Sequence, residues 1–127
     1  MEEKKTYSLE YQKDEENKIL IRSFYGKLGM NGVIASWEDD INNNIVTKDF
    51  NAIITDFTNS ENTVQMSDLG EIAAFYDKNF ELFKDIKLAV VIDTPSVAIL
   101  LLYEDQNTKL NHKAFTTVEA AMNWCII

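Results

Sequence analysis

Two aspartates offer the clearest opportunity for acid–base or metal chemistry. Asp56 and Asp93 each follow a run of apolar residues that is typical of a buried strand. In open α/β sheets, ligand sites lie at the carboxyl ends of parallel strands. If the two strands are neighbours, the two carboxylates could share a proton or bind a hard cation such as Mg²⁺. The alternative is that each carboxylate caps the turn or helix that follows it, since no nucleophile, glycine-rich loop or third ligand accompanies the pair.

The single histidine and the single cysteine are the other reactive side chains. His112 lies in a weak strand pattern, and none of its sequence neighbours is arranged to orient it as a base, which favours a structural role. Cys125 follows Trp124 and has no basic residue close by in the sequence, so we expect a buried, inert thiol. One cysteine excludes an intramolecular disulfide, and one histidine leaves no histidine pair for zinc. We therefore expect no metal and no cofactor.

The strand that leads to Asp93 is the most strongly marked element of the chain. Residues 88–92 form an unbroken apolar, largely β-branched run, which is typical of a strand covered on both faces. Thr94 and Pro95 then predict the start of a helix, with Thr94 as its N-cap and Pro95 at its first position. A strand that leads into a helix in this way is half of a βαβ unit.

Patterns along the rest of the chain predict the elements around that strand. Alternating apolar residues predict a hairpin over 6–13 and 18–26, a third strand over 50–57 and an edge strand over 109–115. Apolar residues spaced by three and four predict helices that begin at Met30, at Ser67 and at Thr116 or Thr117. The expected order is β-β-α-β-α-β-α-β-α. This is an α/β fold with a mixed, mostly parallel five-stranded sheet and four helices, in one domain over 1–127.

The helix predicted after the central strand carries an unusual apolar run. Residues 97–103 make nearly two helical turns with no polar face, whereas a helix on a sheet needs only an apolar stripe. Three explanations are open: burial beneath the polar loop predicted at 58–65 or beneath a neighbouring helix, an interface with another protein or subunit, or the wall of an apolar ligand cavity. The residues that would make such an interface or ligand contact are Val97, Leu100, Leu101 and Tyr103.

Charge and composition narrow the classes of partner. The chain has 21 acidic and 12 basic residues, a net charge of −9, which repels nucleic-acid backbones and anionic membranes. No window approaches the roughly twenty consecutive apolar residues of a membrane span. No apolar segment follows the charged N-terminus as it would in a signal peptide. We therefore expect no nucleic-acid partner, no membrane insertion and a cytoplasmic location.

A likeness to a known fold is carried by the segments 17–21, 26–28, 82–84, 87–93, 114–115 and 119–124. They resemble the STAS domains of anti-sigma-factor antagonists, and more closely a small bacterial branch of that fold that is grouped with the lipid-binding CRAL-TRIO proteins. They extend over nearly the whole chain, but most of them are core and turn positions. The likeness therefore implies a fold more strongly than a function.

The resemblance also implies a regulatory serine. In anti-sigma-factor antagonists, a serine at the start of the helix after the third strand is phosphorylated by a partner kinase, and the phosphate abolishes partner binding. The matching position is Ser67, but Asp68 stands where a second hydroxyl is expected and Gly70 comes one position late. A phosphate on Ser67 would gain from the helix N-terminus and would meet the like charge of Asp68. The alternative is that Ser67 is only the N-cap of its helix.

We therefore expect a non-catalytic protein-interaction or regulatory module with a STAS-like fold. Its contact surface would include 58–65, Ser67 and the exposed part of 97–103, and self-association as a homodimer is one form that the interaction could take. The alternative is a domain that binds a small apolar or lipid-like ligand against 97–103. A third hypothesis, enzymatic activity, depends on Asp56 and Asp93.

Overall fold

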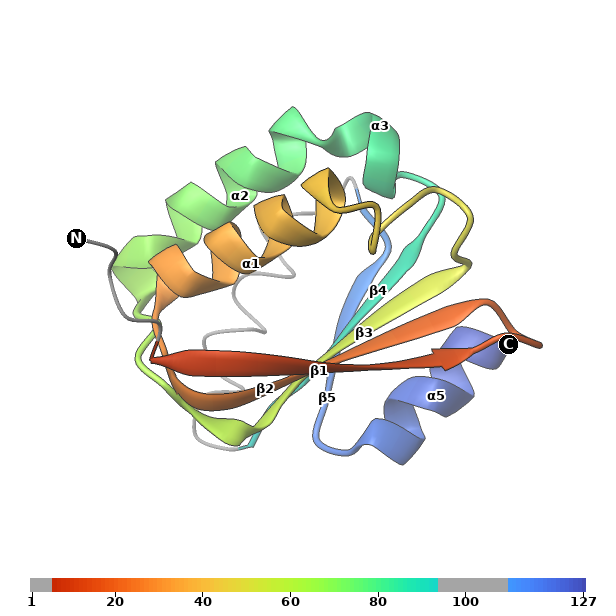
Figure 1. Cartoon of the computed structure of the whole chain (residues 1–127), viewed down its shortest axis with the longest axis horizontal. Coiled ribbons are helices and arrows are strands. Elements are labelled where there is room, and N and C mark those ends of the chain that lie inside the picture. The colour runs from red at the N-terminus through yellow and green to blue at the C-terminus, as the bar shows by residue number, and fades with distance from the viewer. Residues whose placement is uncertain (1–5, 94–109) are drawn as a thin grey trace.

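The computed structural model describes residues 6–93 and 110–127, and it is built on a five-stranded sheet with strand order β1-β2-β3-β4-β5 (Figure 1). The elements are β1 (Tyr7–Asp14), β2 (Ile19–Leu28), α1 (Met30–Asn42), β3 (Ala52–Asn62), the 3-10 turn η1 (Met66–Asp68), α2 (Leu69–Lys78), α3 (Phe80–Phe83), β4 (Lys87–Val91), β5 (His112–Phe115) and α5 (Val118–Ile126). β1 is antiparallel to β2, and all the other neighbouring strands are parallel. The mixed α/β sheet predicted from the sequence is confirmed.

The described helices lie on both faces of the sheet. α1, α2 and α3 lie on one face, and α5 lies on the other (Figure 1). Because side chains alternate along a strand, Leu20 and Phe24 of β2 enter the larger core beneath α1 to α3, whereas Ile19 enters the smaller core. Ala121 and Cys125 of α5 close that smaller core from the other side. The helix predicted over 97–103, with Val97, Leu100, Leu101 and Tyr103, lies outside the described residues.

β3 is longer than the sequence predicted. The strand was expected over 50–57 and a loop over 58–65, but β3 continues to Asn62. Residues 59–62 pair in parallel with 25–28 of β2, after a register shift between Ser23 and Tyr25. This pairing uses backbone groups, so polar side chains at the end of the strand do not prevent it. The predicted loop is therefore mostly strand, and Asp56 lies within β3 rather than at its end.

The start of α2 also differs from the prediction. Ser67 lies inside η1, and the N-cap of α2 is Asp68, so the prediction of Ser67 as N-cap is wrong. The side chain of Asp68 accepts a hydrogen bond at 2.9 Å from the backbone N–H of Gln65, which favours a tight turn ahead of the helix. For α5 the predicted cap is confirmed, because Thr117 Oγ1 accepts from the N–H of Ala120 at 3.1 Å.

A buried ion pair fixes α1 to the sheet. Arg22 of β2 is fully buried, and its Nε donates to Asp40 Oδ2 of α1 at 2.8 Å. Its Nη2 donates to Ser36 Oγ at 2.8 Å, and its Nη1 donates to Thr55 Oγ1 at 3.3 Å. The guanidinium carbon lies 3.9 Å from the centre of the Trp37 ring. The charge is thus hydrogen-bonded on its edges and stacked on its face, as a buried arginine requires.

Asp40 extends this network to the edge of the sheet. Its Oδ1 accepts a hydrogen bond at 2.5 Å from the hydroxyl of Tyr11 on β1, while its Oδ2 holds Arg22. Burial raises the pKa of Tyr11 above its ordinary value, and the hydrogen bond to Asp40 adds to this effect. Burial lowers the pKa of Arg22, and the Asp40 carboxylate opposes that change. One side chain on α1 therefore joins β1 and β2.

Candidate functional site

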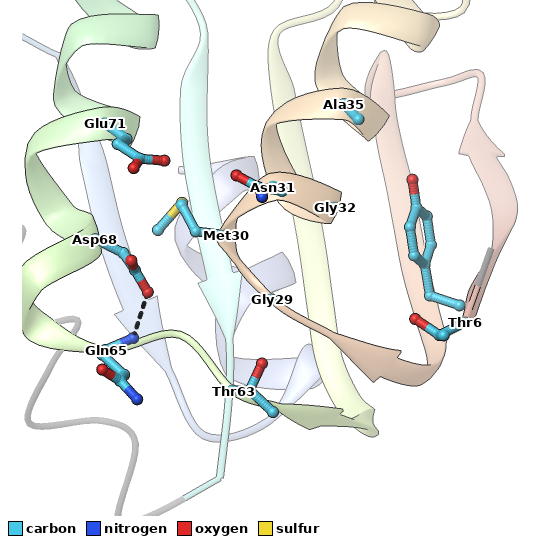
Figure 2. Close-up of a pocket in the computed structure, with 11 residues that line it drawn as sticks. Thr6, Gly29, Met30, Asn31, Gly32, Ala35, Thr63, Gln65, Asp68 and Glu71 are labelled. Carbon is cyan, nitrogen blue, oxygen red and sulfur yellow. Dashed lines mark hydrogen bonds between the residues drawn. The ribbon is translucent and has the colours of Figure 1, made fainter. Parts of the chain in front are cut away.

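A groove of about 810 Å³ opens where β2 and β3 end, beside the first turn of α1 (Figure 2). Gly29 directly follows β2, and Thr63 directly follows β3. The groove thus lies at the carboxyl edge of the parallel strands, the usual position of binding sites in open α/β sheets. The residues that line it are Thr6, Tyr7, Gly29, Met30, Asn31, Gly32, Ala35, Thr63, Gln65, Asp68 and Glu71.

Backbone forms the part of the groove next to the sheet. Gly29 is the N-cap of α1 and supplies no side-chain cap, so the first turn of the helix begins with bare backbone. A Cβ on Gly32 would lie 2.8 Å from Leu28 Cδ1 and 3.0 Å from Tyr7 Cε1, so a larger residue at this position would have to displace these two side chains. The N–H of Thr63 donates to the carbonyl of Leu28 at 2.8 Å, which joins the ends of β2 and β3.

Polar side chains of η1 and α2 form the opposite wall. Figure 2 shows Glu71 of α2 and Asn31 of α1 pointing toward one another across the groove, with Met30 beside them. Asp68 turns its carboxylate toward the backbone of Gln65 and accepts the hydrogen bond described above. Asp68 and Glu71 are the charged residues among those that line the groove. The wall is therefore acidic.

Ser67 lies close to this groove without lining it. The residue is exposed and stands in η1 between Gln65 and Asp68, which both contribute to the lining. Thr63, Gln65 and Ser67 belong to the contact surface predicted from the sequence. The structure places the first two in the lining of the groove and Ser67 close beside it. Residues 97–103 fall outside the part of the chain that the structure describes.

The strands that carry Asp56 and Asp93 are neighbours. β3 and β4 pair in parallel with Asp56 opposite Val91, and Asp93 comes two residues later and is exposed. Asp56 is buried, and its Oδ1 accepts hydrogen bonds from both the N–H and the hydroxyl of Thr58, at 2.9 and 2.7 Å. This oxygen therefore stabilises a local turn. Within residues 6–93 and 110–127, no three histidine, cysteine, aspartate or glutamate side chains gather as metal ligands.

His112 and Cys125 are both held in uncharged forms at neutral pH. The His112 ring meets the ring of Tyr76 edge-on with 5.5 Å between centres, and burial lowers the pKa of His112 to about 4. Burial raises the pKa of the Cys125 thiol to about 11, although the Lys87 ammonium group opposes this shift. The half-buried neutral imidazole of His112 and the buried protonated thiol of Cys125 therefore act as packing groups.

Sequence reasoning missed the groove because its parts are far apart in the chain. The signal that could have indicated it is the spacing of Gly29 and Gly32 around the predicted start of a helix. A glycine at that position allows backbone to approach closely. Nothing in the sequence placed Gln65 or Glu71 opposite these glycines.

Comparison with solved structures identifies the fold. An anti-sigma factor antagonist from Mycobacterium paratuberculosis superposes with a TM-score of 0.59 at 17% identity, over 94% of this chain and 93% of that one. A DUF3478-family protein with a SpoIIAA-like fold from Shewanella loihica superposes with a TM-score of 0.61 at 12% identity, over 98% of both chains. The Bacillus cell-fate determinant SpoIIAA in its phosphorylated form gives a TM-score of 0.51 at 11% identity, over 92% and 98%.

These likenesses establish the fold and no more. No protein-family model matches the sequence, and no curated protein matches it. The chain has a SpoIIAA-like fold, so the STAS-like architecture predicted from the sequence segments is confirmed. Because one fold hosts many functions, the role of the chain must be inferred from its site.

Proposed function

We propose that the chain is a non-catalytic regulatory module that binds another protein over the groove between α1 and η1–α2. The observation that carries this proposal is the position of that groove. It combines exposed backbone with a polar wall at the carboxyl edge of the sheet, in a fold shared with an anti-sigma factor antagonist. Among the described residues that line it, none is histidine, cysteine, lysine or arginine, and its volume and open form suit the surface of a partner.

The state of the reactive side chains supports a binding role over an enzymatic one. The half-buried His112 and the buried Cys125 are both uncharged at neutral pH, and Asp56 already holds the backbone and hydroxyl of Thr58. A general base must reach the proton that it abstracts, and a nucleophile must be activated by a neighbour. The proposal of joint chemistry at Asp56 and Asp93 is tested by a thermal melt with Mg²⁺ or Mn²⁺, where an unchanged midpoint at millimolar metal contradicts it.

A site-specific photocrosslinking experiment tests the docking surface. Asn31 and Gln65 are exposed groove residues, and each would be replaced in the native host by the photoreactive p-benzoylphenylalanine. Asp77 and Glu119 are exposed residues that do not line the groove, and they provide matched control positions. We expect one partner to crosslink at both groove positions and at neither control. Identical products at all four positions, or none at the groove, would contradict the proposal.

We further propose that Ser67 is the position at which the surface is regulated. Ser67 is exposed in η1, and the structurally similar SpoIIAA is known in a phosphorylated form. A phosphate would add about −1.5 to −2 charges beside Asp68, whose carboxylate holds the Gln65 backbone. The turn that forms one wall of the groove would then change in charge and shape. Mass spectrometry of protein from the native host tests this, and an unmodified Ser67 in every growth state would contradict it.

Binding of a small apolar or lipid-like ligand against 97–103 is the alternative function. It stays a prediction, because these residues lie outside the described part of the chain, and so does self-association as a homodimer. Native mass spectrometry tests both: a bare integer multiple of the chain mass gives the oligomeric state, and extra mass that disappears on denaturation reveals a retained ligand.

A cytoplasmic location also remains a proposal. Among the described helices, none is long and apolar enough to cross a bilayer.

A further inference from the structure

We infer that the segment bound in the groove is cationic and inserts an arginine or lysine side chain between α1 and α2. This inference rests on the proposed function and adds the chemistry of the partner. It starts from the two charged residues in the described part of the lining, Asp68 and Glu71, which are both acidic and both stand at the start of α2.

The helix ends do not cancel this negative charge. α1 and α2 both begin at the groove, and a helix N-terminus is equivalent to about +0.5 elementary charge. Two N-termini therefore contribute about +1 against two full carboxylates, which leaves the part of the groove that the structure describes with a net charge of about −1. The whole chain, at −9, adds to the same potential. A cationic side chain is attracted here, and an anionic one is repelled.

The side chains around Glu71 suit a long cationic side chain in particular. Glu71 is exposed and faces the Asn31 amide across the groove (Figure 2). Met30 lines the groove beside them. An arginine or lysine buries its methylene stem on apolar atoms and keeps its charged head among polar ones. Met30 would contact the stem, while the Glu71 carboxylate and the Asn31 side-chain carbonyl would accept hydrogen bonds from the head.

Other occupants fit less well. A phosphorylated or acidic segment would bring negative charge against Asp68 and Glu71. A second copy of this chain carries the same net charge of −9, which opposes its association. A cationic segment from a different protein is the occupant that the charge of the groove favours.

A titration with short peptides tests the inference directly. The ¹⁵N-labelled full chain would be titrated with acetylated and amidated Gly-Gly-X-Gly-Gly peptides in which X is arginine, lysine, glutamine or glutamate. We expect the arginine and lysine peptides to shift the amide signals of Gly29, Asn31, Gly32 and Glu71 saturably, and the other two to leave them unchanged. Added salt should weaken the binding, because the attraction is between charges near solvent.

Paired charge variants locate the effect. Glu71→Lys should weaken binding of the arginine peptide about tenfold, because it replaces attraction by repulsion. Asp77→Lys changes the net charge equally on an exposed position of the same helix outside the groove lining, and it should leave the affinity unchanged. Glu71→Gln should fall between the wild type and Glu71→Lys. A thermal melt of each variant shows that the fold is intact.

Three results would overturn the inference. They are absence of groove shifts with the cationic peptides, shifts of equal size with the glutamate peptide, and equal loss of affinity in Glu71→Lys and Asp77→Lys. Failure of the proposed function gives a different observation: the photocrosslinker at Asn31 then captures no partner. A partner whose crosslinked segment is neutral or acidic would retain the docking surface and overturn only its cationic chemistry.

Discussion

Asp40→Ala should be among the most destabilising single substitutions in this fold. The change leaves the guanidinium of Arg22, which is 0% exposed, with two hydroxyl partners and no counter-charge. Removing one member of a buried ion pair costs about 3–5 kcal/mol, because the remaining charge is desolvated and uncompensated. The hydrogen bond from Tyr11 is lost as well, which adds about 1 kcal/mol. The expected loss is a large share of the roughly 5–15 kcal/mol that stabilises a domain.

Urea unfolding of a double-mutant cycle measures this loss. Trp37 lies against Arg22, so its fluorescence reports the packing of α1 on the sheet together with the global transition. Arg22→Met removes the stranded charge while keeping apolar volume. The Arg22→Met/Asp40→Ala double variant should therefore be more stable than Asp40→Ala alone by about 2 kcal/mol or more. Asp40→Asn, which keeps hydrogen-bonding capacity without the charge, should fall between Asp40→Ala and the wild type.

Two outcomes would refute this reasoning. If Asp40→Ala lowers the free energy of unfolding by less than about 1 kcal/mol, the Arg22–Asp40 pair contributes no more than an exposed salt bridge does. A double variant no more stable than Asp40→Ala would show that the stranded charge is not the cause of the loss. Stacking of the guanidinium on Trp37 would then be the main contribution of Arg22.

Three further predictions test other parts of the structure. Gly32→Ala should cost up to about 2 kcal/mol, because overpacking of about 1–3 kcal/mol against Leu28 is partly offset by the roughly 1 kcal/mol that alanine gains over glycine in a helix, and a raised thermal midpoint would contradict the close approach of α1. The pKa of His112 is about 4 in the folded state and about 6.5 in the unfolded state, so the unfolded state binds the proton more tightly. The free energy of unfolding should therefore fall from pH 6.5 towards pH 4, by at most about 3 kcal/mol. In His112→Phe, the urea midpoint should no longer change with pH over that range. If the midpoint still falls, groups other than His112 cause the pH dependence. Thr117→Ala should cost about 1 kcal/mol in a thermal melt, whereas Thr116→Ala, its exposed neighbour, should cost clearly less.

Patterns that depend on neighbouring residues predicted the fold well. The apolar run 88–92 indicated a buried inner strand, and β4 lies between β3 and β5. The sequence predicted a threonine cap for the last helix, and Thr117 caps α5 in the structure. The length of β3 could not be read in the same way. Residues 59–62 are polar, and their place in the sheet depends on backbone pairing with β2.

Features that depend on contacts between residues far apart in the sequence could not be predicted from the sequence. Arg22 and Asp40 are charged residues in a strand pattern and a helix pattern, where such residues ordinarily face solvent. Only the folded structure shows that they meet at 2.8 Å in the core. The groove is a similar case, since Gly29, Gln65 and Glu71 come together through the packing of α1 beside η1 and α2.

The two walls of the groove are held in different ways, and this difference bears on regulation. α1 is fixed near its end by the Asp40 ion pair and near its start by the close approach of Gly32 to the sheet. η1 is a three-residue turn that two hydrogen bonds join to Gln65: the N–H of Asp68 donates to the Gln65 carbonyl, and the Asp68 carboxylate accepts from the Gln65 N–H. The phosphate that we propose at Ser67 would act on this second wall, where Gln65 and Ser67 are both exposed. A modification at η1 can therefore alter the groove while the ion pair keeps α1 in place.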